Sequence, residues 1–435
     1  MIKKIYFRVF VYLFIWQIYL YFMSNNSPLG VEWLPWHYQR LYNFSQFLKL
    51  NGYFSNFGFS IWTFCENCNL NFENWKDKIY LTRTFFSQLP SVIINHLFGS
   101  EILKQYGHFS DKITILMSGI LISELFIMLS GDNKKKVKYF QAILCFIFFT
   151  INPWTYKMII AHWAIVFFLF FYLIGIFMFL NKKYNLGLLF FFIAGLFSFE
   201  SSAGIAFFYI LLLLYLNKNK YNYDKYFFNI NSKVLNYKVI FSLIFPVLIY
   251  FSLKVIAISE YQAVEGSSFL QRVGISGDDI HNGSLLGALQ FLGGNRITNC
   301  LVNFNSNINL NNLSDSIEMY NCVLSISSMY IISLASIFGL FILYKKYKSF
   351  NNLIIFPILF LFLLYTFILQ QSSSVHLMGY SYLFSILFSV GIVSVIFHIL
   401  KKYSYSITSI SLSVPITIGL MILCVRVSML TGLNS

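Results

Sequence analysis

Long apolar stretches, separated by short lysine-rich segments, recur along this sequence and restrict it to a membrane fold. The chain has 435 residues, of which 57% are hydrophobic and only 11% are charged, whereas soluble domains carry roughly 25% charged residues. Apolar stretches of about 20 residues can cross the ~30 Å hydrocarbon core of a bilayer as helices. We therefore expect an all-α polytopic membrane protein that forms a single integral membrane domain over residues 1–435.

The formal net charge of +15 indicates membrane topology, and nucleic acid is not an expected partner. The lysines gather in short runs between apolar stretches, for example in residues 134–138 and at Lys401-Lys402, as is typical of cytoplasmic loops. Lys3 and Lys4 precede the first stretch. The N-terminus is therefore predicted to be cytoplasmic, with the first stretch a retained anchor in a bacterial plasma membrane.

This pattern predicts about eleven transmembrane helices and an external C-terminus. The segments near residues 139–216 are shorter than a typical span. The predicted spans are residues 5–23, 113–130, 139–151, 161–180, 186–199, 205–216, 239–258, 323–344, 353–369, 376–400 and 409–429.

Two large polar loops are predicted on the outer face, at residues 24–111 and 259–321. In the first loop, apolar side chains recur at near-helical spacing over residues 38–51, which favours a helix lying in the membrane interface. A second apolar segment, residues 85–98, is too short for a span. We predict that it forms another interfacial or a re-entrant helix.

Two glutamates are candidates for acid–base chemistry. Glu32 lies nine residues beyond the first span, beside Trp33 and Trp36, where partial desolvation would suit a general base. The alternative is a solvated loop glutamate next to an interfacial tryptophan belt. Glu200 precedes a turn at the outer ends of two short spans. Its side chain either faces the same cavity as Glu32 or forms a hydrogen bond between helices. Glu124 lies deeper and is interpreted as a packing contact.

Basic residues at the outer ends of spans oppose the positive-inside trend. They either bind a lipid phosphate or pyrophosphate or extend to the lipid headgroups without a specific ligand. His37 and Arg40 follow Glu32 closely in the sequence. They are predicted to bind substrate, as the basic residues at the outer ends are. The predicted substrate-binding residues are His37, Arg40, Lys254, Arg296 and Arg426, and Lys157 has a similar position.

The adjacent pair Asp278-Asp279, followed by His281, suits a hard divalent cation. The flanking Gly277 and Gly283 equally suit an exposed turn. A divalent cation at this pair is the one cofactor that the sequence suggests.

Four cysteines fall in the predicted outer loops: Cys65, Cys68, Cys300 and Cys322. In an oxidising compartment they allow three pairings, which the sequence alone leaves open. We favour Cys65–Cys68 and Cys300–Cys322. A redox or zinc role for the C-x-x-C pair is the minor alternative, because a second ligand pair is missing from its loop.

The order of parts resembles the GT-C superfamily of polytopic, lipid-phosphate-dependent glycosyltransferases. Glu32, followed by HYQRLYNFSQFLKLNGYF and GFSIW, stands where that family has an acidic residue and membrane-surface helices in its first outer loop. Members commonly have Asp-Asp, Glu-x-Asp or a lone acid there, and this chain has the lone-acid form. The resemblance implies a polyprenyl-phosphate sugar donor, with Glu32 as the base for the acceptor hydroxyl, Glu200 as a supporting acid and outer-edge Arg or Lys residues on the donor phosphate.

The sequence thus predicts a GT-C-like transferase that adds a sugar to a cell-surface glycan or lipid on the outer face. An O-antigen-type polymerase or ligase, acting through residues 259–321 with Arg272 and Arg296, is one alternative. A transporter or flippase using Glu124 at mid-membrane depth is the non-enzyme alternative.

Overall fold

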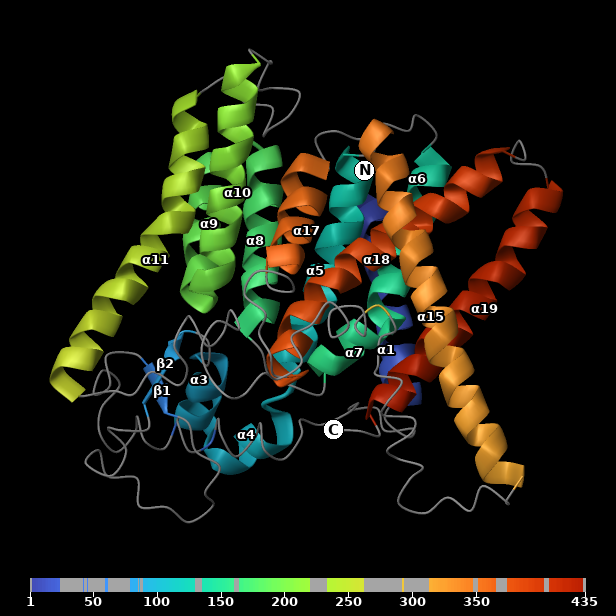
Figure 1. Cartoon of the computed structure of the whole chain (residues 1–435), viewed down its shortest axis with the longest axis horizontal. Helices are drawn as coiled ribbons and strands as arrows, with labels where there is room; N and C mark the ends of the chain where they lie inside the picture. Colours follow the sequence, from blue (N-terminus) through green and yellow to red (C-terminus); the bar gives the residue numbers. More distant parts are fainter. Residues whose placement is uncertain are drawn as a thin grey trace. The chain divides into compact units, whose positions relative to one another are not determined.

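The computed structural model (Figure 1) is built almost entirely of helices. It describes residues 2–23, 42, 45, 59–61, 79–84, 86, 89–129, 135–159, 164–219, 233–261, 292, 313–346, 351–364, 374–402 and 407–432. The chain divides into two compact units, each described by itself. Unit 1 comprises residues 1–31, 119–157 and 278–435, and unit 2 comprises residues 32–118 and 158–277.

Helices and two short strands follow one another along the chain in this order: α1 (Ile2–Met23), β1 (Phe59–Ile61), β2 (Ile79–Thr84), α3 (Leu89–Phe98), α4 (Ser100–Tyr106), α5 (Phe109–Leu129), α6 (Lys135–Ile151), α7 (Pro153–Ile159), α8 (Ala164–Leu180), α9 (Tyr184–Phe197), α10 (Phe199–Lys218), α11 (Lys233–Tyr261), α15 (Leu313–Lys346), the π-helix η5 (Asn351–Ile355), α17 (Phe356–Leu363), α18 (Ser374–Lys402) and α19 (Ile407–Gly432).

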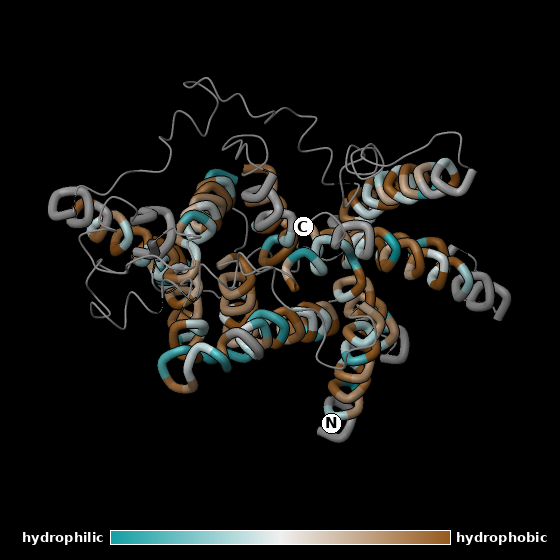
Figure 2. Tube along the Cα trace, turned by 90° about the horizontal axis from the view of Figure 1, so that it is seen from below, coloured by the Kyte–Doolittle hydropathy of each residue, from teal (hydrophilic) through white to brown (hydrophobic). Residues whose placement is uncertain are grey.

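Every segment predicted to span the membrane contains a helix where the structure describes it, which confirms the helical fold class. Among the described residues, five helices are long and apolar enough to cross a membrane, or six if α6 and α7 form one bent span. Shorter apolar helices accompany them, and apolar residues predominate along the helical tubes of Figure 2. The number of eleven spans and the single membrane domain stay predictions.

The segment predicted to be the first outer loop, residues 24–111, contains two strands that an all-α fold does not include. β1 pairs antiparallel with β2, with Ser60 opposite Tyr80 and Ile61 opposite Ile79. β2 has the sequence IYLTRT, rich in the aromatic and β-branched residues that favour strands.

The helices predicted in this loop are described in part. Of residues 38–51, Tyr42 and Ser45 are described and are helical, and the Asn95 side-chain amide of α3 donates a hydrogen bond to Ser45 Oγ at 2.7 Å. Tyr42 packs against Leu103 of α4. The second predicted helix, over residues 85–98, is α3, which begins at Leu89.

In unit 1, α15 and α18 cross at two glycines. A Cβ atom on Gly339 would collide with the carbonyl oxygen of Gly391, and one on Gly391 would collide with the carbonyl oxygen of Ser336. Small residues at such crossings let helix backbones approach closely inside a membrane. Elsewhere along α18, Phe384 contacts Trp154, which is fully buried, with ring centroids 4.7 Å apart.

In unit 2, α8, α9, α10 and α11 form a packed group. The hydroxyls of Tyr172 on α8 and Tyr209 on α10 share a buried 2.6 Å hydrogen bond. Ser202 Oγ on α10 donates to the carbonyl of Leu243 on α11 at 2.7 Å. Inside a bilayer such hydrogen bonds satisfy polar groups that water does not reach.

Candidate functional site

Three ionisable side chains near the start of α5 are buried. Their exposed fractions are 2% for His108, 0% for Asp111 and 1% for Lys112. Burying charged groups is costly unless other groups compensate them, so three buried ionisable side chains this close in the sequence form a candidate functional site. We call His108, Asp111 and Lys112 the α5 cluster.

Local sequence explains how the chain enters this cluster. α4 ends at Tyr106, and the Gly107 N–H donates to the carbonyl of Leu103 at 2.9 Å. Ser110 Oγ then donates back to the carbonyl of Gly107 at 2.9 Å, which closes the turn. Asp111 falls in the first turn of α5, where a carboxylate interacts favourably with the positive end of the helix dipole.

One aromatic ring contacts both nitrogen-bearing side chains of the cluster. The His108 ring stacks on Phe109 with centroids 4.7 Å apart, and Lys112 Nζ lies 5.4 Å from the Phe109 centroid, within the range of a cation–π interaction. Ser110 Oγ lies 3.4 Å from Asp111 Oδ2 as a hydrogen-bond donor. The cluster therefore combines a carboxylate, an imidazole and an ammonium group away from solvent, the side chains required to move a proton and to stabilise an anion.

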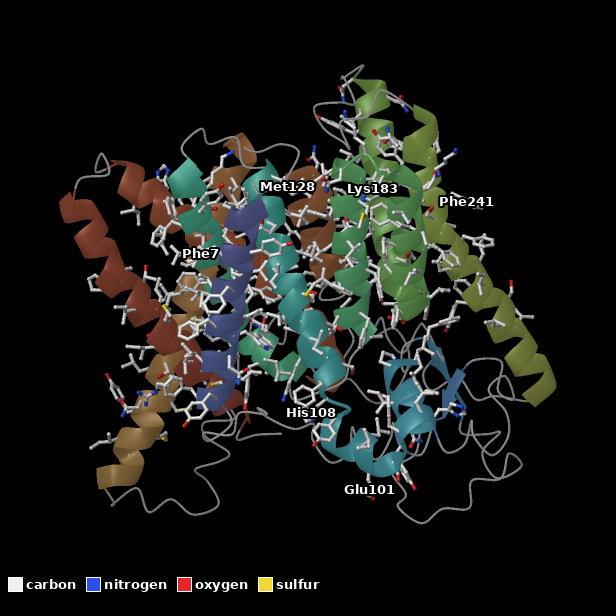
Figure 3. All side chains as sticks on the ribbon, turned by 180° about the vertical axis from the view of Figure 1, so that it is seen from behind. Phe7, Glu101, His108, Met128, Lys183 and Phe241 are labelled. Atoms are coloured by element: carbon white, nitrogen blue, oxygen red, sulfur yellow. The ribbon has the colours of Figure 1, made fainter. Side chains whose placement is uncertain are left out.

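The α5 cluster lies at one end of unit 2. Figure 3 shows His108 and Glu101 at the end opposite Lys183, which stands in the turn between α8 and α9. Because α9 runs away from Lys183, and α10 runs back to Lys218, the start of α10 lies toward the same end as His108.

Glu200 belongs to this end of unit 2. It is half-buried in the first turn of α10, after Ser198, whose Oγ accepts a hydrogen bond from the Ser201 N–H at 3.4 Å. Lys254 lies in the last third of α11, which ends at Tyr261; its side chain is outside the description. The structure thus places Glu200 and the α5 cluster at the same end of unit 2 (Figure 3).

In unit 1, Glu124 of α5 forms an ion pair with Arg8 of α1. Arg8 Nε donates to Glu124 Oε1 at 2.8 Å and Nη2 donates to Oε2 at 2.6 Å. Tyr12 donates a longer bond of 3.3 Å to Oε1, and the Arg8 guanidinium lies 4.7 Å from the ring centroid of Tyr139 on α6. Glu124, interpreted from sequence as a packing contact, therefore joins α5 to α1 through a forked ion pair, and Arg8 extends the contact to α6 through Tyr139.

Unit 1 also contains a helix break at Asn152, where α6 and α7 meet with a bend of 59°. The fully buried Asn152 amide donates to the carbonyls of Phe148 and Phe149 at 2.8 and 2.7 Å, and its Oδ1 accepts from the Thr155 N–H at 2.8 Å. One side chain thus caps the end of α6 and the start of α7. Pro153 as the first residue of α7 suits this geometry.

Asn152→Ala is expected to lower the free energy of unfolding by about 1–2 kcal/mol, as for other lost helix caps. Thermal unfolding in detergent would measure the change. Asn181→Ala is the matched control, because the Asn181 amide donates to the Phe177 carbonyl at 2.8 Å from an exposed turn. Equal stability of the two variants would contradict a bridging role for Asn152.

The structure describes some of the remaining predicted residues and not others. Arg426 is exposed on α19. Cys322 is buried and disulfide-bonded, whereas Cys145 and Cys424 are free and buried. The following lie outside the described residues, so their predicted roles and pairing stay predictions: Glu32, His37, Arg40, Cys65, Cys68, Asp278, Asp279, Arg296 and Cys300.

A metal site was predicted only at Asp278-Asp279, which the description does not reach. Within the part of the chain that the structure describes, no group of three or more His, Cys, Asp or Glu side chains could hold a metal ion.

The sequence interpretation missed the α5 cluster, since it took Asp111 only as the end of the first outer loop. The available signal was the segment HFSDK directly before an apolar run, because ionisable residues that enter a span are rare. No family model, curated protein or solved structure matches this chain.

Proposed function

We propose that this protein is a GT-C-like membrane glycosyltransferase that moves a sugar from a polyprenyl-phosphate donor to a cell-surface glycan or lipid acceptor on the outer face. The observation that supports it most is the α5 cluster. A carboxylate, an imidazole and an ammonium group are buried where the first outer loop leads into a helix. Such a set can activate a hydroxyl and stabilise a phosphate leaving group.

In the proposed reaction, Asp111 accepts the proton of the acceptor hydroxyl. The acceptor oxygen attacks the anomeric carbon of the donor sugar, and the bond from that carbon to the phosphate oxygen breaks. Polyprenyl phosphate leaves with the bonding electrons, and Lys112 balances its charge. The proton stays on Asp111 in this step. Glu32, which the sequence interpretation made the base, is the alternative to Asp111 in that role, and Glu200 and the outer-end basic residues keep their predicted supporting roles.

Charge distribution supports an outer location. Lysines stand at the ends of the unit 2 helices in the turns at Lys182-Lys183 and at Lys218, and the α5 cluster lies at the opposite end (Figure 3). Under the positive-inside rule the lysine end is cytoplasmic. The disulfide at Cys322 fits an oxidising outer compartment for the start of α15.

Asp111→Asn is expected to slow sugar transfer at least ~100-fold, because a general base contributes ~10²–10⁴-fold. The purified protein in liposomes would receive a panel of polyprenyl-phosphate sugars and an extract of surface glycans, and release of polyprenyl phosphate would be measured. Glu101→Gln is the matched control, since Glu101 is an exposed carboxylate of α4 close by in the same loop. It should retain the wild-type rate.

Three outcomes would contradict the proposal or one of its assignments. Wild-type transfer by Asp111→Asn, together with loss of transfer in Glu32→Gln, would assign the base to Glu32. Movement of the intact lipid-linked sugar across the liposome, without cleavage, would favour a flippase. The transporter alternative depended on Glu124 as a charged residue at mid-membrane depth, and Glu124 instead forms an ion pair with Arg8. Loss of activity in Arg296→Ala alone would favour the polymerase or ligase.

A further inference from the structure

Three exposed lysines gather at the end of unit 2 opposite the α5 cluster. Lys182 and Lys183 form the turn between α8 and α9, and Lys218 is the last residue of α10. Figure 3 shows Lys183 at the end away from His108. We call Lys182, Lys183 and Lys218 the lysine patch.

A buried hydrogen bond shows that the two helix ends of the patch belong together. The hydroxyls of Tyr172 on α8 and Tyr209 on α10 meet at 2.6 Å, and both helices run from this bond toward the lysine end. Lys182 follows Tyr172 by ten residues, and Lys218 follows Tyr209 by nine. At ~1.5 Å per helical residue, each lysine is therefore ~14–15 Å beyond the hydrogen bond.

The charges of unit 2 are separated along its helices. α10 begins with Glu200 in its first turn and ends with Lys218, and Glu101 lies at the end labelled by His108 (Figure 3). Within the part of the chain that the structure describes, none of the three patch lysines forms an ion pair. The patch therefore presents a concentrated positive charge, which suits an anionic partner.

The backbone of Lys182 is strained. Its φ of 62° lies in the left-handed region, where side chains with a Cβ are disfavoured. Its N–H donates to the Phe179 carbonyl and the Lys183 N–H donates to the Met178 carbonyl, both at 2.9 Å, which is the helix ending that normally takes glycine at this position. A lysine held in a strained position indicates a role for its side chain beyond closing the turn.

Exposed leucines adjoin the patch on both of its helices. Leu186 and Leu189 are exposed in the first two turns of α9, and Leu211 and Leu214 are exposed on the face of α10 that carries Lys218. The apolar span of α10 ends at Lys218 itself. A soluble anion would contact the lysines alone, whereas a phospholipid places its headgroup at the lysines and its chains against the leucines.

We propose that the lysine patch binds the headgroups of anionic phospholipids in the leaflet at this end of unit 2. The lysine ammonium groups attract the net negative charge of these headgroups, as basic segments next to membrane-spanning helices do in general. This lipid site lies at the end of unit 2 opposite the α5 cluster and does not rest on the proposed transfer activity.

The test measures lipid binding to the purified full-length protein in detergent, by mass spectrometry of the intact protein with its bound lipid. Phosphatidylglycerol is the anionic probe, and phosphatidylcholine is the zwitterionic one. A lysine next to an anionic headgroup contributes about fivefold in affinity, so the triple variant Lys182→Gln/Lys183→Gln/Lys218→Gln should bind phosphatidylglycerol ~100-fold more weakly. Its binding of phosphatidylcholine should not change.

Replacement of the same three lysines by arginine is the matched control, because it keeps the charge and should keep the affinity. Equal affinity of the wild type and the glutamine variant for phosphatidylglycerol would overturn the proposal. Release of the bound lipid by inorganic phosphate, at an ionic strength at which chloride does not release it, would also overturn it, since the preferred ligand would then be a soluble anion.

Lys182→Gly separates lipid binding from folding and keeps the test decisive if the glutamine variant does not fold. Glycine adopts the left-handed conformation without strain, so this variant should unfold in lipid-free detergent at the wild-type temperature or above. Its affinity for phosphatidylglycerol should nevertheless fall about fivefold, whereas Lys182→Arg should keep it. A Lys182→Gly protein with unchanged affinity would show that the side chain does not contact lipid, and would overturn the proposal at this residue.

Discussion

Glu124→Leu is expected to lower the free energy of unfolding by about 3–5 kcal/mol, the usual loss when one partner of a buried ion pair is removed. The Arg8 and Glu124 side chains are only 9% and 19% exposed, so the remaining guanidinium would stay largely out of water without its carboxylate. The Tyr139 ring beneath Arg8 offers only a weaker cation–π contact in exchange. Chemical or thermal unfolding in detergent would measure the loss.

The double variant Arg8→Met/Glu124→Leu separates the effect of losing the ion pair from the effect of leaving the Arg8 guanidinium without its carboxylate. Apolar side chains often replace a buried ion pair with little or no loss of stability, so the double variant should recover most of what Glu124→Leu loses. Glu101→Gln, at an exposed carboxylate, is the single-site control and should change little. A double variant as unstable as Glu124→Leu would show that the cost does not come from the uncompensated arginine.

Gly391→Ala is expected to destabilise unit 1 by about 3 kcal/mol, in the upper part of the range for overpacking. The added methyl group would meet the carbonyl oxygen of Ser336, which belongs to the backbone of α15 and cannot rotate away as a side-chain end can. The two helices would have to separate along their contact. The same measurement of unfolding in detergent applies.

Gly419→Ala is the matched control for this substitution. Gly419 lies inside α19, and beyond the local backbone of its own helix no atom of the described residues lies within 4 Å of the position its Cβ would take. Alanine is favoured over glycine in helices by about 1 kcal/mol, so Gly419→Ala should be neutral or stabilising. Two alanine variants of the same sign and size would contradict a close crossing of α15 and α18.

Helix positions were predictable from the sequence because apolar length is a local property. The predicted membrane spans are shorter than the helices where a helix continues past its apolar core. α15 begins at Leu313, before the predicted start at residue 323, and α11 begins at Lys233 instead of residue 239. Hydropathy marks where a chain leaves the hydrocarbon core, but a helix needs only its own backbone hydrogen bonds to extend beyond it.

The contacts that define the sites were not predictable in this way. Arg8 and Glu124 are 116 residues apart, and Tyr172 and Tyr209, whose hydrogen bond places the lysine patch, lie on separate helices. Neither pair has a local pattern that identifies its partner. Asp111 differs, because the segment HFSDK before an apolar run was a visible signal. Glu32 was instead the predicted base because of its neighbouring tryptophans and its position after the first span.

The two units are interleaved along the chain, and this sets an order for their completion during synthesis. All of unit 2 has been made once residue 277 is added, whereas unit 1 still lacks residues 278–435. Until α18 is made, Trp154 has no contact with Phe384. The partner that Arg8 requires, Glu124, is by contrast available after about a quarter of the chain. The ion pair can therefore hold the first helices of unit 1 together while the ribosome completes the rest.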